Sequence, residues 1–96
     1  KYMNQRKLRG FDDTELWSLD CTICSFIAPR LKVFIENTMS SCPGKFMDNP
    51  DEWVEILNKM LYAFEHYEVN YKMDENADKI EEGLNLFHEY FNMLWD

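Results

Sequence analysis

The sequence predicts an all-α domain, a small bundle of three main helices that follow a basic N-terminal arm. Apolar residues recur at steps of three and four over three long segments, and no segment of useful length shows the alternation of a β-strand. The predicted helices cover residues 12–38, 50–67 and 76–95, and the arm covers residues 1–10. Ninety-six residues suffice for one small domain and not for two, so 1–96 is read as a single domain.

The segment 12–38 is expected to be the central helix, kinked at Pro29. Two apolar stripes lie side by side along it: Leu16, Ile23, Ile27, Leu31 and Phe34 in one, and Trp17, Cys21, Cys24, Ala28, Leu31 and Ile35 in the other. So wide an apolar arc predicts neighbours on more than one side. Asp12 and Glu15 are spaced as a capping box at its start. Pro29 cannot donate a backbone hydrogen bond, which predicts the kink.

The other two helices have equally clear signals. Asn49 is placed as an N-cap with Pro50 in the first helical position, so a helix begins there after a loop at 40–49. The last helix carries a seam with coiled-coil-like spacing, made of Ile80, Leu84, Phe87, Phe91 and Leu94. Gly83 inside it costs about 1 kcal/mol relative to alanine and suggests a close helix crossing. Residues 68–78 read either as a loop or as a continued helix.

Charge is divided unevenly along the chain. The net charge is −8; residues 1–10 carry +4, so residues 11–96 carry −12. An acidic body disfavours direct binding of nucleic acid. The arm is either a solvated tail or a segment that binds an anionic surface, such as the acidic body of a second copy.

Apolar residues are more numerous than three helices can easily bury. Aromatic residues make up 16% of the chain, and six methionines accompany them. We therefore expect apolar surface to remain for a partner, and a homo-oligomer is the simplest such assembly. Trp95, near the end of the sequence, is a candidate interface anchor.

The three cysteines favour a structural role in a reducing cytoplasm. An odd count with no secretory signal argues against a disulfide scaffold, and no apolar run approaches the roughly 20 residues of a membrane span. Cys21 and Cys24 form a C-x-x-C, but within an apolar helical stretch next to Asp20. That setting raises a thiol pKa, which favours buried cysteines over a redox or metal site. Cys42 adds no second ligand pair.

No catalytic or metal-binding constellation is evident, so we expect a protein that is not an enzyme and has no metal or cofactor. His66 and His88 lack the Glu-x-x-His spacing of di-metal bundles. A Cys-His nucleophile pair has no local signature either.

Asp20 is the most informative single residue. It falls on the apolar side of its predicted helix, where an unpartnered carboxylate is costly, so we expect an ion pair with Arg9, Arg6 or Arg30. The alternative is a ligand-contacting group in a pocket with Trp17 and Arg30. The candidate ligand or interface residues are Arg6, Arg9, Trp17, Asp20, Arg30 and Trp95.

Several motifs resemble those of a set of small proteins encoded by tailed bacteriophages. They are Arg9-Gly10-Phe11, Trp17-x-Leu19-Asp20-x-x-Ile23, Phe26-Ile27-x-Pro29-Arg30-Leu31-Lys32, Glu52-Trp53-x-Glu55-Ile56-Leu57-x-Lys59-Met60, and Glu81-Glu82-Gly83-Leu84-x-Leu86-Phe87-x-x-Tyr90-Phe91-x-x-Leu94-Trp95-Asp96. The resemblance spans most of the chain except the 70s. It implies a phage product in the cytoplasm of an infected bacterium, and it supplies no catalytic residue.

Taken together, these features favour a binding protein that acts stoichiometrically against host defence. It would occlude a host protein, or sequester a small anionic nucleotide through Arg6, Arg9 and Arg30 with Trp17 or a tyrosine as the stacking face. One alternative is an acidic nucleic-acid mimic that inhibits a host nucleic-acid-binding protein. Another is a structural role in the virion or its assembly.

Overall fold

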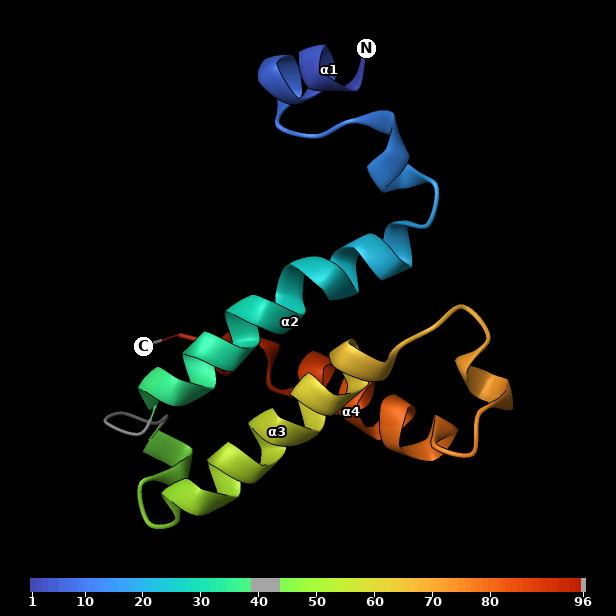
Figure 1. Ribbon diagram of the computed structural model, residues 1–96. Helices are drawn as coiled ribbons and strands as arrows, with labels where there is room; N and C mark the ends of the chain where they lie inside the picture. Colours follow the sequence, from blue (N-terminus) through green and yellow to red (C-terminus); the bar gives the residue numbers. More distant parts are fainter. Residues whose placement is uncertain (39–43, 96) are drawn as a thin grey trace.

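The computed structural model describes residues 1–38 and 44–95, and within them the chain is all-helical, with 79% of it in helix and no strand. The all-α class is therefore confirmed. The α-helices are α1 (Tyr2–Arg9), α2 (Leu19–Asn37), α3 (Pro50–His66) and α4 (Ala77–Glu89) (Figure 1). Short 3₁₀ turns lie between and after them: η1 (Asp13–Leu16), η3 (Gly44–Phe46), η4 (Tyr71–Met73) and η5 (Phe91–Met93). Residues 39–43, with Cys42 and most of the first half of the predicted loop, fall outside the described residues.

The central helix is α3, and the prediction that the segment 12–38 is central is wrong. α3 packs along α4 on one side and along α2 on the other. Its buried side chains form the core, and four of them have no exposed surface: Trp53, Leu57, Met60 and Ala63. In α2 only Cys24 and Leu31 are buried. The wide apolar arc of α2 predicted helices packed on more than one side of it, and this prediction is wrong for the described residues, because α3 covers one side and leaves the other exposed.

The contact between α3 and α4 depends on a glycine. A Cβ atom at Gly83 would lie 2.3 Å from the carbonyl oxygen of Lys59 and 2.5 Å from the Cβ of Ala63. Two helix backbones can approach this closely only where one has no side chain. The predicted close crossing is confirmed.

The start of the predicted first helix differs from expectation. The capping box of Asp12 and Glu15 is present, but it opens the short turn η1 rather than the long helix. The chain leaves helical geometry at Ser18, whose φ of −139° and ψ of 72° are not helical, and α2 begins only at Leu19. Serine competes with the helical ladder and is common where a helix begins. α2 then continues through Pro29 as one helix, and a kink there stays a prediction.

The last helix is shorter than predicted. α4 ends at Glu89, and Tyr90 leaves the helix before η5. The Tyr90 ring packs edge-on against Phe46 at 5.7 Å and against Trp53 at 5.9 Å. This aromatic cluster competes with continuation of the helix, so the predicted helix to residue 95 is wrong at its end. The start of α3 is as predicted, with Asn49 as its cap and Pro50 in the first turn.

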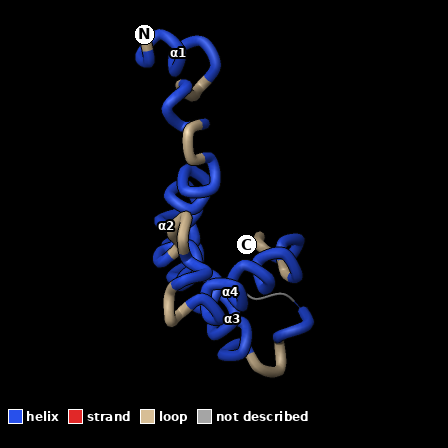
Figure 2. Tube along the Cα trace, turned by 90° about the vertical axis from the view of Figure 1, so that its right-hand side faces the viewer, coloured by secondary structure: helices blue, strands red, loops and turns tan. Residues whose placement is uncertain are grey.

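The arm projects away from the three packed helices. α1 ends at Gly10, whose φ of 81° is left-handed, and none of its residues is buried. Figures 1 and 2 show α1 and η1 beyond the N-terminal end of α2. The radius of gyration is 15.6 Å, with extents of 52 × 34 × 19 Å. A compact domain of this length has a radius of gyration of about 12.5 Å. The molecule is thus long and thin.

Replacing Gly83 by alanine should destabilise the protein, although alanine is the better helix former. The added methyl group collides with backbone and with Ala63, which typically costs about 1–3 kcal/mol, while the gain in helix propensity is about 1 kcal/mol. Chemical denaturation should show a net loss. Gly44→Ala, where nothing lies within 4 Å, is the control and should change the unfolding free energy by less than about 0.5 kcal/mol. Equal stability of Gly83→Ala and the wild type would contradict the close crossing.

Candidate functional site

Arg6 and Arg9 hold the arm on η1. The Arg6 guanidinium donates to Asp12, which is buried, and Arg9 donates to Asp13 at 2.7 Å. The Gln5 side chain adds two hydrogen bonds to Asp13, one to its carboxylate and one from its backbone N–H, both 2.8 Å. Two of the three arginines predicted to bind a ligand are therefore paired within the arm itself.

The electrostatics of this arm unit agree with that pairing. The hydrogen bond from Thr14, followed by that from Arg6, lowers the pKa of the Asp12 carboxyl. The hydrogen bond from Gln5, followed by that from Arg9, lowers the pKa of Asp13. Both carboxylates are therefore held in the charged form, which is the form that binds the arginines.

Asp20 binds a tyrosine, and the prediction of an arginine partner is wrong. Its carboxylate accepts a hydrogen bond from the Tyr67 hydroxyl, and none of the described ion pairs includes it. Arg6 and Arg9 lie on the far side of the turn at Ser18, whereas the end of α3 brings Tyr67 to the first turn of α2. The bond lowers the pKa of Asp20 and raises that of Tyr67 to about 12. The hydrogen bond between Asp20 and Tyr67 thus links the start of α2 to the end of α3.

The remaining candidates lie apart from one another. The Arg30 guanidinium stacks over the Phe26 ring at 3.7 Å and donates to the Phe26 carbonyl oxygen at 2.8 Å. Trp17 is 70% exposed, and its ring lies edge-to-face with that of Tyr2, with 6.1 Å between the ring centres. Trp95 is 64% exposed, close to the end of the sequence. No pocket found among the described residues joins Arg30 to the arm or to Trp17.

The two described cysteines lie within the apolar helix α2, where their sequence context predicts structural thiols with raised pKa values. Cys24 is buried, and Cys21 is partly buried. Burial raises the pKa of both thiols, and the charge of Asp20 adds to the effect at Cys21. The predicted direction is confirmed. Both thiols are protonated at neutral pH, the less reactive form. Within residues 1–38 and 44–95, no three potential metal ligands lie together.

A groove that sequence reasoning missed lies between α2 and the end of the chain. It encloses about 250 Å³, and we call it the apolar groove. Its lining comes from α2, the end of α4 and the segment after it: Phe26, Ile27, Arg30, Leu31, Phe34, Phe87, Phe91 and Leu94. Among the described residues that line it, Arg30 alone is charged. The sequence spacing predicts that Phe91 and Leu94 continue a straight helix. In the structure the chain bends at Tyr90, and this bend brings both side chains to α2.

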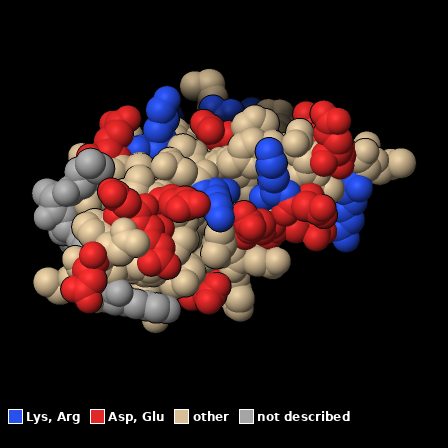
Figure 3. All heavy atoms as spheres, turned by 90° about the horizontal axis from the view of Figure 1, so that it is seen from below, with Lys and Arg blue, Asp and Glu red and all other residues tan. Residues whose placement is uncertain are grey.

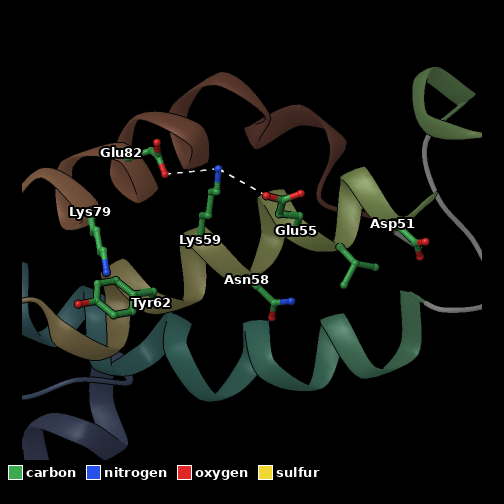
Figure 4. A pocket seen from close by; sticks show the side chains of 8 residues that line it. Asp51, Glu55, Asn58, Lys59, Tyr62, Lys79 and Glu82 are labelled. Atoms are coloured by element: carbon green, nitrogen blue, oxygen red, sulfur yellow. Dashed lines mark ion pairs between the residues drawn. The ribbon is translucent and has the colours of Figure 1, made fainter. Parts of the chain in front are cut away.

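A second, charged groove of about 580 Å³ runs along the outer face of α3 (Figure 4). The Lys59 ammonium group lies between Glu55, at 3.8 Å, and Glu82 of α4, at 3.6 Å. Lys79 points toward the Tyr62 ring, 5.9 Å from its centre. Both cations are therefore engaged by neighbours. Figure 3 shows the same mixture more widely, with basic side chains set among the acidic ones on the face seen from below.

One side of α2 is left uncovered. Leu19, Ile23, Phe26 and Val33 are each about half exposed, and we call this row the outer stripe. It borders the apolar groove at Phe26. Exposed apolar residues in a continuous row mark an interaction surface more often than a solvated one.

The chain matches no protein-family model, no curated protein and no solved structure. Over the described residues, no helix has both the length and the apolar character needed to cross a bilayer.

The Asp20–Tyr67 bond should make one of the five tyrosines unusually hard to ionise. We expect one phenol to titrate near pH 12 in the wild type and near its ordinary pKa of 10 in Asp20→Asn, followed by tyrosinate absorbance. Glu36→Gln, an exposed acid on the same helix, is the control and should leave the titration unchanged. Identical titrations of the wild type and Asp20→Asn would show that the bond is absent.

The same bond should make stability depend on pH at both extremes. Tyr67 has a raised pKa, so its contribution is complete below pH 10 and is lost as the pH rises through about 12. Asp20 has a lowered pKa, so its contribution is present above about pH 4 and is lost as the pH falls further. The stability difference between the wild type and Tyr67→Phe, measured by urea denaturation, should therefore be largest near neutral pH. A difference that does not change with pH would contradict this.

Proposed function

We propose that this protein is a non-enzymatic binding protein that acts by stoichiometric association with another protein, and that the apolar groove is its contact site. The observation that carries the proposal is the cluster of aromatic rings open to solvent on both sides of the groove. Phe26, Phe87 and Phe91 line it, and Phe91 is 63% exposed. Aromatic side chains in a concave apolar setting are the usual energetic centres of protein interfaces.

The chemistry of the groove favours an amphipathic helix as the bound element. Such a helix presents apolar anchors every three or four residues, which suits a groove between two helical walls. The Arg30 guanidinium already donates one N–H to the Phe26 carbonyl oxygen and has further donors at the rim. An acidic residue beside the anchors of the partner helix would pair with it. Trp95 follows the groove residue Leu94 and extends the apolar surface.

The biological setting that we propose follows the resemblance to small bacteriophage proteins. In that setting the bound protein belongs to the bacterial host, and occluding its surface counters a defence in the host cytoplasm. Sequestration of a nucleotide has less support, because Arg6 and Arg9 are paired with Asp12 and Asp13. An acidic nucleic-acid mimic also has less support, because Lys59 and Lys79 interrupt the acidic face of α3 and α4.

Substitution of Phe91 tests this function. Tagged wild-type protein should retain a bacterial protein in equimolar amount, and the purified pair should bind in isothermal titration calorimetry. Phe91→Glu should weaken that binding by at least about 30-fold, because a charge would occupy the apolar groove. Asn92→Glu carries the same new charge on the neighbouring exposed residue and should bind like the wild type.

Two results would reject the proposal. One is a partner that binds Phe91→Glu as tightly as the wild type, since the groove would then not be the contact site. The other is chemical conversion of the partner by sub-equimolar amounts of the protein, since that would make the protein an enzyme.

A further inference from the structure

The outer stripe of α2 has the spacing of a helix-packing seam, but none of the helices in residues 1–38 and 44–95 packs along it. Leu19, Ile23, Phe26 and Val33 follow one another at steps of four, three and seven, and Arg30 divides the last step into four and three. Seams with this spacing are typical of helices that pack side by side. The opposite side of α2 already packs on α3. The stripe is therefore a second packing surface of the same helix.

We propose that the outer stripe is the interface of a two-fold symmetric dimer, in which α2 packs antiparallel against α2 of a second copy with Phe26 at the axis. In a two-fold interface the same surface is used by both copies, so it must complement itself. With Phe26 facing Phe26, Leu19 lies opposite Val33 of the second copy. Ile23 then lies opposite the helical turn that carries Arg30. Every large apolar residue of the stripe thus meets an apolar side chain or the aliphatic stem of an arginine.

The position of Arg30 selects the antiparallel orientation. Parallel packing would place Arg30 beside Arg30 of the second copy, and like charges in direct contact repel. Arg30 cannot turn away without losing its stack on Phe26 and its bond to the Phe26 carbonyl oxygen. Antiparallel packing separates the two guanidinium groups to either side of the axis.

Charge at the two ends of the molecule favours the same arrangement. The basic helix α1 lies beyond the N-terminal end of α2, and the first turn of α3 lies near its C-terminal end (Figure 1). Antiparallel packing brings α1 of one copy toward the α3 start of the other, twice per dimer. Lys7 on α1 makes no ion pair within the described chain, and neither do Glu36, Asp51 and Glu52 at the opposite end. Opposite charges would meet there and fix the register.

The stripe supplies a large part of the apolar area that a dimer needs. Trp17 adjoins the N-terminal end of the stripe, and a buried aromatic side chain removes about 150–250 Å² from water. Together with the half-exposed residues of the stripe, it supplies several hundred Å² per copy. A standard interface takes about 800 Å² from each partner, so in the proposed dimer the facing α1 and α3 ends contribute the remainder.

Light scattering of the purified protein over a range of concentrations tests the dimer. The wild type should have twice the mass of one chain. Phe26→Glu places two carboxylates at the axis and should raise the dissociation constant by at least about 100-fold. Ser25→Glu, with the same charge one residue away on an exposed position off the stripe, should remain a dimer. Circular dichroism checks that each variant is folded, and Phe26→Ala, which should also weaken the dimer, replaces Phe26→Glu if that variant unfolds.

A charge pair tests the orientation. Leu19→Glu and Val33→Lys should each weaken the dimer alone, and together they should restore it, because the new charges face each other across an antiparallel interface. In a parallel dimer they would face like charges and would not restore it. A monomeric wild type, an assembly larger than a dimer, or unchanged association of Phe26→Glu would overturn the proposal. Failure of the double variant to recover would overturn the antiparallel arrangement. None of these measurements involves a host protein. Phe26 and Arg30 lie both along the stripe and in the apolar groove, whereas Phe91 lies only in the groove and Leu19 only in the stripe. Phe91→Glu should therefore leave the dimer intact and Leu19→Glu should leave binding of another protein intact, which distinguishes failure of the dimer from failure of the proposed function.

Discussion

The close approach of α3 and α4 at Gly83 is the constraint on which the rest of the structure depends. Because Gly83 has no side chain, the backbone of α4 lies against the Lys59 carbonyl group and Ala63. This contact holds α4 against α3 and directs the apolar stripe of α3 toward the interior. Helices held this closely share a dry seam in which each side chain must fit its neighbours. Trp53, Leu57 and Met60 are then buried without residual exposure.

That core also determines where the chain goes after α4. With Trp53 and Phe46 stacked at 5.1 Å, an aromatic surface is presented to Tyr90, and the chain leaves the helix to pack there. The bend carries Phe91 toward α2 and forms the apolar groove. The candidate binding site is therefore a consequence of core packing, since it exists only because the last helix ends early.

The edge position of α2 explains how a small core coexists with a large apolar surface. α3 has room for one side of α2, and Asp20 with Tyr67 ties the start of α2 to the end of α3. The other side of α2 and the arm beyond it stay outside the core. In a thin molecule such surface stays exposed to solvent, which is why both proposals place an interface there. The elongated shape and the exposed apolar residues of α2 thus share one physical origin.

Local patterns in the sequence determined the helical class, the cap at Asn49 and the capping box at Asp12, because each depends on residues within a few positions of one another. The raised thiol pKa values of Cys21 and Cys24 followed from their apolar neighbours in the same way. A glycine inside the last helix indicated a close crossing at Gly83, but only the fold shows that Lys59 and Ala63 of α3 lie against it. Tertiary structure alone decided that α3 is central, that Asp20 binds Tyr67 and that the chain bends at Tyr90. Each of these features depends on which apolar surfaces pack against one another. The residues that form such contacts are tens of positions apart in the sequence. Spacing along the chain shows that α2 has two apolar sides, but only packing shows which one is left open.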